Sequence, residues 1–400
     1  MKIEPKIRGF ICTTAHPKGC AQHVQEQVSY VREKANINGP SKVLIIGCST
    51  GYGLASRIVA SFSCNADTVG VCFEKAASGK RTASAGWYNT AAFEKLATQH
   101  GVQALTLNGD AFSHELKQQT VHTIKQHLGS VDLVIYSLAS PKRVDPDTGQ
   151  VYHSVLKTTG GTYCAKTVDP IRGTLSDVAV EPATEDEIEQ TIQVMGGQDW
   201  QLWMKALAEG DVLSENCITV AYSYVGPELT YPIYRQGTIG KAKEDLEKTA
   251  AQLTEQLAPI NGKAYVAVNK AVVTQASAAI PVVPLYMSIL FKVMKELDCH
   301  EDCVQQIYRL FADCLYQGNT VPIDTAGRIR IDDWEMRKDV QQQVEKIWQL
   351  VDQENLLEHA DLEEYQTRFY QLFGFEFPEI DYQQEVDVDV AIPSLEAVEA

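Results

Sequence analysis

The sequence predicts an α/β fold in which a doubly wound, mostly parallel sheet carries helices on both faces. From Lys42 onward, apolar runs of strand length alternate with amphipathic stretches of helix length, which is typical of parallel strands joined by crossover helices. A glycine-rich turn separates the first apolar run from the stretch that follows it. The chain has 400 residues, of which 44% are hydrophobic and 22% charged, as in an ordinary globular protein with a sizeable core.

This alternation predicts the elements of the fold in chain order. Strands are expected at Val43–Gly47, Thr68–Phe73, Ala104–Asn108, Val131–Ser137, Ile218–Ser223 and Ala264–Asn269. Helices are expected at Gly51–Ala60, Thr90–His100, Ser113–Leu128, Ile239–Leu257 and Leu285–Leu297. That number of strands is enough for a doubly wound sheet.

Three regions are expected to form one structural unit. Residues 1–40 would pack on a dinucleotide-binding core, 41–282, and residues 283–400 would add a helical extension with an acidic tail. The core carries an insertion, 141–216, after its fourth strand. Ligands of open α/β sheets bind beyond the carboxyl ends of the strands, so this insertion is expected to shape a substrate pocket.

Two segments outside the regular alternation carry predictions of their own. In the insertion, a helix is expected over Glu185–Val194, with Thr184 as its cap and Glu187 at the capping-box position. The tail, Asp387–Ala400, has four acidic residues and few large apolar ones, so we expect it to be mobile.

Charge and hydropathy argue against nucleic-acid and membrane partners. The net charge of -17 disfavours nucleic-acid binding, which needs a clustered basic surface. The longest nearly apolar stretch, Ala278–Phe291, contains Pro281 and Pro284 and is too short to span a bilayer. Met1–Phe10 lacks the apolar core of a secretory signal. We therefore expect a cytoplasmic protein.

The ten cysteines are better interpreted as reduced thiols than as a disulfide framework, because the chain has no export signal. Two clusters contain residue types that bind zinc: Cys12, His16, Cys20 and His23, and Cys299, His300 and Cys303. Neither cluster has a paired-thiolate spacing, and Pro17 and Gly19 interrupt any helix that would align the first. We expect no metal.

The glycine-rich turn is a candidate nucleotide site. It lies between a buried strand and a helix start, where Gly47, Gly51 and Gly53 permit a tight turn and close backbone approach. The helix N-terminus offers free N–H groups and a positive dipole to a pyrophosphate. This G-x-x-x-G-x-G spacing resembles that of the short-chain reductases. A purely structural turn is the alternative.

Residues that follow the next strands extend this site. Phe73 and Glu74 end the second strand, where a carboxylate would accept hydrogen bonds from the adenosine ribose and repel a 2′-phosphate. This position favours NADH over NADPH, unless Glu74 is only a solvated strand end. Asp110-Ala111 and Ser137–Pro141 follow the third and fourth strands, where loops flank the adenine and the nicotinamide ribose.

Tyr234 and Lys243, after the fifth strand, are the candidate catalytic pair. A phenol and a fixed cation suit the reduction of an activated C=C bond, in which negative charge develops on a thioester oxygen. The ammonium is expected to lower the phenol pKa and to hold the nicotinamide ribose. Residues nine apart lie on opposite faces of a helix. Because Gly237 and Thr238 offer a helix start, we expect Tyr234 in the preceding loop and Lys243 on the second turn.

The same residues admit a purely structural interpretation. Several tyrosines precede the helix and could be packing groups, with Lys243 a surface lysine. Their position after the fifth strand, in a chain with a nucleotide loop, favours catalysis. Tyr224 is then the candidate for a second hydroxyl that hydrogen-bonds to the thioester carbonyl.

With these motifs the chain resembles the FabV-type trans-2-enoyl-CoA and enoyl-acyl-carrier-protein reductases of the short-chain dehydrogenase/reductase superfamily. The matching segments span essentially the whole chain: Ile7–Cys12, Gly47–Gly53, Ser137–Pro141, Gly226–Glu228, Tyr234-x8-Lys243 and Val272–Ser277. The eight-residue separation is the specific element, since related short-chain enzymes use three or six.

The resemblance implies a monomeric, Rossmann-type, NADH-dependent reductase that acts in the last reductive step of fatty-acid elongation. Hydride would pass to C3 of the enoyl thioester, with Tyr234 as proton donor, Lys243 binding NADH and Tyr224 at the substrate. The implied cofactor contacts are Gly47, Cys48, Ser49, Thr50, Gly51, Tyr52, Phe73, Glu74, Asp110, Ala111, Leu138, Ala139, Val272, Val273 and Thr274.

Two other functions remain open from the sequence. A short-chain carbonyl or 3-oxoacyl reductase would share the nucleotide loop but normally uses a Tyr-x3-Lys helix. A non-catalytic NAD-sensing protein would tolerate loss of Tyr234. The carrier of the substrate, CoA or acyl carrier protein, is also open. An acidic carrier would need a basic patch, for which Lys142-Arg143 or Lys292 with Lys295 are candidates.

Overall fold

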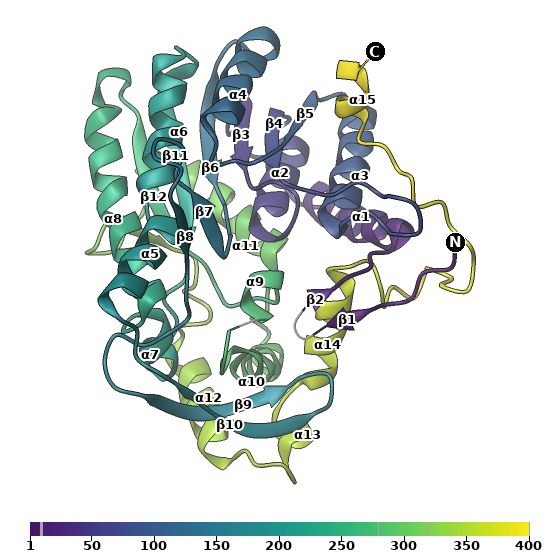
Figure 1. The fold of residues 1–400 in the computed structure, drawn as a ribbon, viewed down its shortest axis with the longest axis vertical. Coiled ribbons are helices and arrows are strands. Elements are labelled where there is room, and N and C mark those ends of the chain that lie inside the picture. The colour runs from purple at the N-terminus through teal and green to yellow at the C-terminus, as the bar shows by residue number, and fades with distance from the viewer. Residues whose placement is uncertain (9–10, 279, 319, 400) are drawn as a thin grey trace.

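The computed structural model describes residues 1–8, 11–278, 280–318 and 320–399, and a seven-stranded sheet forms its centre (Figure 1). The strands lie in the order β13-β12-β11-β6-β3-β4-β5, with every adjacent pair parallel. Their bounds are β3 Lys42–Ile46, β4 Asp67–Cys72, β5 Ala104–Asn108, β6 Val131–Tyr136, β11 Leu213–Ser223, β12 Lys263–Val268 and β13 Arg328–Arg330. The chain reverses its direction of winding between β3 and β6, which is where ligands bind in such sheets.

Helices cover both faces of this sheet, which confirms the predicted fold class. On one face lie α1 (Pro17–Arg32), α2 (Gly51–Ser63), α3 (Ala85–His100) and α11 (Cys303–Arg309), and on the other α4 (His114–His127), α6 (Gln198–Glu209) and α8 (Thr238–Gln256). Along β3, Val43 and Ile45 enter the first core and Leu44 and Ile46 the second. Successive side chains of a strand point to opposite faces, so a continuous apolar run fills two cores.

The predicted strands and helices are confirmed, although several of their ends differ. Helix α3 begins at Ala85 rather than Thr90, and β11 begins at Leu213 rather than Ile218. The sequence pattern does not predict β13, which has three residues, two of them arginines. Its pairing with β12 comes from tertiary packing and not from a local apolar run.

The insertion contains two antiparallel hairpins, whereas the sequence predicted only loops around a helix. The first pairs β7 (Lys142–Val144) with β8 (Val151–His153), and the second pairs β9 (Tyr163–Asp169) with β10 (Thr174–Val180). Most β10 side chains are exposed or only half-buried, so its sequence shows no clear apolar alternation. The helix prediction is confirmed as α5 (Glu185–Met195), where Thr184 and Glu187 form the capping box.

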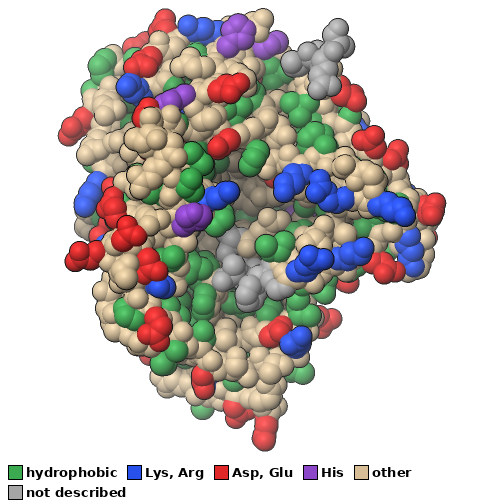
Figure 2. Space-filling view, in the orientation of Figure 1, with side chains coloured by type: hydrophobic (Ala, Val, Ile, Leu, Met, Phe, Trp, Pro, Cys, Tyr) green, Lys and Arg blue, Asp and Glu red, His purple; other side chains and the backbone are tan. Residues whose placement is uncertain are grey.

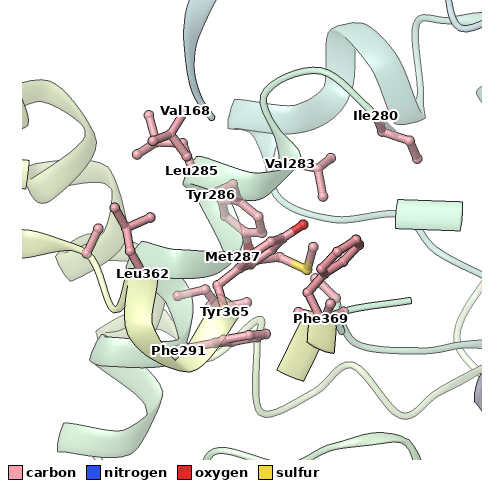
Figure 3. Close-up of a cluster of buried hydrophobic side chains, with 14 of the residues drawn as sticks. Val168, Ile280, Val283, Leu285, Tyr286, Met287, Phe291, Leu362, Tyr365 and Phe369 are labelled. Atoms are coloured by element: carbon pink, nitrogen blue, oxygen red, sulfur yellow. The ribbon is translucent and has the colours of Figure 1, made fainter. Parts of the chain in front are cut away.

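The hairpin β9–β10 and four C-terminal helices form a second layer, which we call the C-terminal lobe. The helices are α10 (Val283–Glu296), α12 (Lys338–Leu350), α13 (Leu356–His359) and α14 (Leu362–Gln371). Figure 3 shows the centre of the lobe, where side chains of α10 such as Tyr286 and Phe291 lie beside Tyr365 and Phe369 of α14. This lobe lies across the end of the sheet at which the parallel strands finish (Figure 1).

Short elements connect these layers. They are β1 (Ile7–Arg8), β2 (Ile11–Cys12), η1 (Glu228–Thr230), α7 (Tyr231–Tyr234), η2 (Ala258–Ile260), α9 (Gln275–Ala278), the π-helix η3 (Leu310–Leu315) and α15 (Pro393–Glu399). Gly9 and Phe10 of the N-terminal motif, Ala279 of the apolar stretch and Ala400 of the tail lie outside the described residues.

The prediction of a mobile tail is wrong for the segment that leads into α15. Trp87 Nε1 donates to Val390 O at 2.6 Å, and Tyr88 Oη donates to Val388 O at 2.8 Å. Ser394 Oγ donates to the buried carboxylate of Glu94 at 2.7 Å. Backbone carbonyls and one serine hold this tail, which a hydropathy pattern does not register.

Among the described residues, no helix combines the length and apolar character needed to cross a bilayer. In the same part of the chain, no three His, Cys, Asp or Glu side chains are grouped as metal ligands. The ten cysteines are all free thiols, and most of them are buried.

Candidate active site

The glycine-rich loop follows β3 and leads into α2, as predicted, and its glycines are required by close contacts or by a positive φ. Gly47 has φ +88°, and a Cβ there would lie 2.3 Å from Ser137 O. A Cβ at Gly53 would lie 1.8 Å from Gly47 O, while Gly51 has φ +53°. Thr50 precedes α2 without a side-chain cap, so the first N–H groups of the helix remain available to an anion.

A cleft of ≈ 160 Å³ adjoins this loop. Thr50, Gly51, Asn89 and Val272–Thr274 are among the residues that line it. Asn89 is 2% exposed, and its Oδ1 has no hydrogen-bond partner in the described part of the chain. A buried acceptor without a partner costs free energy unless a ligand or water satisfies it. The backbone approach and this acceptor together fit a dinucleotide.

Glu74 is held in place and is not only a solvated strand end. Its two carboxylate oxygens accept hydrogen bonds from Ser49 Oγ at 2.6 Å and Ser84 Oγ at 2.5 Å. Its backbone N–H donates to Asn108 Oδ1 at 2.7 Å. The neighbouring Phe73 side chain is 77% exposed, so a large aromatic surface stands free beside the carboxylate.

The other predicted loop positions also lie at the carboxyl ends of strands. Asp110 is exposed, and its Oδ1 accepts a hydrogen bond from Phe112 N at 3.0 Å. Ala111 is buried, and its carbonyl accepts hydrogen bonds from Lys117 Nζ and Trp203 Nε1. After β6, Leu138 is half-buried and Ala139 is exposed. These positions surround the end of the sheet near the glycine-rich loop.

The chain breaks between Tyr234 and Lys243, which confirms that one helix does not contain both residues. Tyr234 is the last residue of the short helix α7 rather than a loop residue, so that detail of the prediction is wrong. Helix α8 starts at Thr238, with Gly237 instead of Thr238 as its cap, and Lys243 lies on its second turn as predicted. Because of the break, the two residues are not held on opposite faces of one helix.

The two tyrosines expected at the substrate are in contact. The rings of Tyr224 and Tyr234 meet edge to face, with centroids 4.5 Å apart and an interplanar angle of 80°. Tyr234 is 7% exposed, and its hydroxyl makes no hydrogen bond to the described residues. Burial and the nearby Glu335 and Tyr365 raise the pKa of Tyr234, so its phenol keeps its proton.

Lys243 does not lower the pKa of Tyr234 in this structure, contrary to the expectation from the sequence. Its Nζ donates to Tyr222 O at 3.2 Å. Burial lowers the pKa of Lys243 to about 8, and Glu247 partly opposes the shift. The ammonium therefore lies next to the end of β11. It uses one N–H group there, and its other N–H groups can donate to a ligand.

Several buried polar residues near this pair were not predicted from the sequence. Glu335 accepts a hydrogen bond from Tyr224 Oη at 2.9 Å, and Tyr52 Oη donates to Lys270 O at 2.7 Å. Gln306 Nε2 donates to Tyr52 Oη at 2.8 Å. Glu335 lies 111 positions after Tyr224, and no local motif marks it. Only the packing of the C-terminal lobe brings it to the site.

The basic pairs suggested for an acidic carrier are not available as a patch. Arg143 is 1% exposed and donates to Gln193 O and the Gln198 side chain. Lys292 pairs with Glu296, and Lys295 pairs with carboxylates of α14. Because Arg143 is buried and both lysines of the second pair are bonded to carboxylates, neither pair forms a free cationic surface. Lys142 alone is exposed.

Three family models match successive parts of the chain. Residues 2–79 match the NAD(P)H binding domain of trans-2-enoyl-CoA reductase, and residues 81–316 match the trans-2-enoyl-CoA reductase catalytic region. Residues 323–386 match a model described as the enoyl reductase FAD binding domain. The first match contains the glycine-rich loop and Glu74, and the second contains Tyr224, Tyr234 and Lys243.

Residues 323–386, all of them described, contain no arginine that is free to bind the phosphates of an FAD, and their exposed lysines are Lys338 and Lys346. The phosphates of a dinucleotide need free N–H groups or free cations. Each arginine of this segment is already paired with a carboxylate: Arg328, Arg330, Arg337 and Arg368. Its glycines are Gly327 and Gly374, and a Cβ at Gly374 would lie 2.4 Å from His16 O, so this glycine serves packing. We assign no chemistry to a flavin.

Known proteins are similar to this chain over nearly its whole length. The trans-2-enoyl-CoA reductase [NADH] of Ruminiclostridium cellulolyticum is 56% identical over 99% of this chain and 100% of its own length. The enoyl-[acyl-carrier-protein] reductase [NADH] of Coxiella burnetii is 56% identical over 99% of this chain and 98% of its own. The crystal structure of Treponema denticola trans-2-enoyl-CoA reductase with NAD has a TM-score of 0.93 and 48% identity over 96% of this chain and 98% of its own. The chain therefore belongs to the trans-2-enoyl-CoA reductase family.

Proposed function

We propose that this chain is an NADH-dependent reductase of the trans-2 C=C bond of an enoyl thioester, the last reductive step of fatty-acid elongation. The observation that carries the proposal is the protonated phenol of Tyr234, buried against Tyr224 and separated from Lys243 by a helix break. The relatives' names, enoyl-CoA and enoyl-acyl-carrier-protein reductase, support the same activity.

In the proposed reaction, bound NADH supplies a hydride to C3 of the enoyl thioester. Tyr234 then donates its proton to the negatively charged thioester enolate, and solvent returns a proton to the phenol. Because burial raises the pKa of Tyr234, the phenol carries the proton that the enolate receives. Lys243 would hold the ribose of a bound NADH through the N–H donors that Tyr222 O does not use.

The proposed dinucleotide site runs from the glycine-rich loop to the loop after β12. Gly47–Tyr52 would hold the pyrophosphate, Phe73 and Glu74 the adenosine, and Asp110, Ala111, Leu138 and Ala139 the rim of the site. Val272–Thr274 would face the nicotinamide. Glu74 would repel a 2′-phosphate because both groups are negatively charged, and two serine hydroxyls hold its carboxylate in place.

Crotonyl-CoA with NADH tests the proposal. We expect NADH oxidation by the wild type, and a loss of kcat of at least about 100-fold in Tyr234→Phe, the size of a lost general acid. Tyr231→Phe, on the same short helix, is the matched control and should keep kcat within about threefold.

A ketoacyl thioester separates the competing functions. Consumption of the ketoacyl substrate alone would identify a 3-oxoacyl reductase and overturn the proposal. Tight NADH binding without turnover of either thioester would identify a non-catalytic NAD-sensing protein.

Finer properties belong to the same proposal. We infer a distant place in the short-chain dehydrogenase/reductase superfamily, supported by the parallel sheet and the loop spacing. We also propose a cytoplasmic monomer that folds as one unit across regions 1–40, 41–282 and 283–400. Size-exclusion chromatography with light scattering tests the monomer, for which the chain mass is 44.3 kDa.

The carrier can be either CoA or acyl carrier protein, since relatives carry both names. Figure 2 shows the face of the molecule that is seen in Figure 1. This face is hollowed near its middle, and Lys and Arg side chains gather beside the hollow. Exposed cations of the N-terminal hairpin and of the loop after β4 make no ion pairs among the described residues: Lys6, Arg8, Lys75, Lys80 and Arg81. Phosphate groups are present on both carriers, so turnover of both at several chain lengths decides between them.

A further inference from the structure

Glu335 is a buried carboxyl group placed against the two tyrosines of the proposed site. Its side chain is 0% exposed. Oε1 accepts hydrogen bonds from Tyr224 Oη at 2.9 Å and from Tyr286 Oη at 2.6 Å, and Oε2 accepts one from Ala271 N at 2.8 Å. All three of these partners donate to the carboxylate, which suits its negative charge.

The hydrogen bond to Glu335 determines what Tyr224 can offer to a ligand. A phenol has one proton, and an ionised carboxylate can only accept. With its proton directed at Oε1, Tyr224 presents a lone pair, and not a donor, to the substrate side. This arrangement conflicts with the expectation that Tyr224 donates to the thioester carbonyl.

Tyr234 has the opposite arrangement, although its ring touches that of Tyr224. Its hydroxyl makes no hydrogen bond within the described structure, and its pKa is raised. Among the described residues, no other group therefore holds its proton. Two neighbouring phenols thus differ, because one is bonded to a buried carboxylate and the other is not.

The surroundings of Glu335 connect it to both layers of the molecule. Gln341 donates to Tyr286 Oη at 3.3 Å and to the Glu335 backbone carbonyl at 2.7 Å. Burial raises the pKa of Glu335, whereas the hydrogen bonds from Tyr286 and Ala271 N and the charge of Lys270 favour its ionised form. Lys270 donates its backbone N–H to Gln306, which also bonds to Tyr52 of the glycine-rich loop.

We propose that Glu335 is a positioning residue of the reductase: it directs the Tyr224 proton away from the substrate and leaves Tyr234 as the phenol that donates. This inference rests on the proposed function and adds a residue from the segment that was matched to a flavin-binding domain. Glu335 acts through Tyr224 and has no contact with the reacting atoms.

Glu335→Gln tests the direction of this hydrogen bond with almost no change in volume. A glutamine whose oxygen accepts from Ala271 N would turn its NH₂ toward the tyrosines, so that Tyr224 becomes an acceptor and its proton faces the site. Packing and hydrogen-bond count are kept. We expect kcat with crotonyl-CoA to fall about 10- to 100-fold, as for a lost hydrogen bond to a charged group, and the KM for NADH to stay within about threefold.

A double-mutant cycle separates positioning from a merely structural role. If Glu335 acts through Tyr224, then Glu335→Gln should change kcat less than about twofold in a Tyr224→Phe background, because the effects of coupled residues are not additive. Glu301→Gln is the matched control: it neutralises another carboxyl group of 2% exposure, bonded to Arg309 and not to a tyrosine, and should leave kcat unchanged.

Two outcomes would overturn the inference: an unchanged kcat in folded Glu335→Gln, or an equal loss with and without the Tyr224 hydroxyl. If Glu335→Gln does not fold, Glu335→Met takes its place in the same cycle, because it also removes the acceptor of the Tyr224 proton: a kcat loss that disappears in the Tyr224→Phe background supports the inference, and no loss contradicts it. A wild type that does not reduce crotonyl-CoA would contradict the proposed function instead, so the two failures are distinguishable.

Discussion

The sheet half of the molecule and the C-terminal lobe bury their apolar side chains in different ways. In the sheet, strand residues alternate between two cores, and each helix covers one face. In the lobe, α10 is buried around its whole circumference, from Val283 to Phe291, by α12, α14 and the hairpin β9–β10. The sheet half is therefore specified by local patterns, whereas the lobe depends on segments that are distant in sequence.

The two regions also divide the proposed chemistry. The sheet half supplies the glycine-rich loop, Glu74 and Lys243, which would hold the cofactor. The lobe supplies Tyr365, and the connection just before its helix α12 supplies Glu335; both raise the pKa of Tyr234. Cofactor binding and proton donation should therefore respond to different substitutions.

Removal of a lobe core side chain should have the largest effect on stability. Phe291 is 0% exposed at the centre of the lobe. Phe291→Ala is expected to lower the free energy of unfolding by about 3 to 5 kcal/mol, through lost burial and a cavity. Urea denaturation measures this. Leu357→Ala, at an 80% exposed position of α13, is the control and should change it by less than about 0.5 kcal/mol. Equal losses would contradict the assigned lobe core.

A methyl group in the nucleotide loop should damage the sheet half instead. Gly47→Ala combines left-handed strain at φ +88° with contact against Ser137 O, so we expect a loss of about 2 to 4 kcal/mol and weaker NADH binding. Gly129→Ala has a similar φ of +79° and open space, so it isolates the strain. Calorimetry and NADH titration measure both variants. If the two variants lose the same stability and the same affinity for NADH, the close contact between position 47 and Ser137 O does not cause the loss.

The pH profile should show the role of Lys243. Its folded pKa of about 8 lies below the ordinary value of 10.5, so the charged form is lost as pH rises above 8. We expect kcat/KM for NADH to fall about tenfold between pH 8 and pH 9.5 if only the ammonium binds ribose. Lys243→Arg stays charged and should flatten this limb of the profile. An alkaline fall that persists in Lys243→Arg would assign it to another group.

The smallest expected effect is on the preference for NADH over NADPH. Glu74→Ala removes a half-exposed charge at the proposed site of the adenosine ribose, so the ratio of kcat/KM for NADPH to that for NADH should rise about threefold to tenfold, the size of a screened charge interaction. Steady-state kinetics with both cofactors measure the ratio. Glu115→Ala, an exposed carboxylate on α4, is the control. An unchanged ratio in Glu74→Ala would leave Glu74 a structural residue that orients Ser49 and Ser84.

The amino-acid sequence by itself determined the parallel sheet, the position of the glycine-rich loop and the break between Tyr234 and Lys243. These features depend on contiguous residues: apolar runs, glycines where a Cβ does not fit, and a helix start at Gly237 and Thr238. The reaction class came from resemblance of motifs across the chain.

Only the tertiary structure decided the rest. The hairpin β9–β10, the strand β13 and the anchored tail carry weak local patterns, because their pairing and packing partners lie far away in sequence. The same reason explains why Glu335 was missed. Its carboxylate differs from the exposed acidic residues of the chain only because the lobe buries it against Tyr224 and Tyr286, and burial depends on the assembled fold.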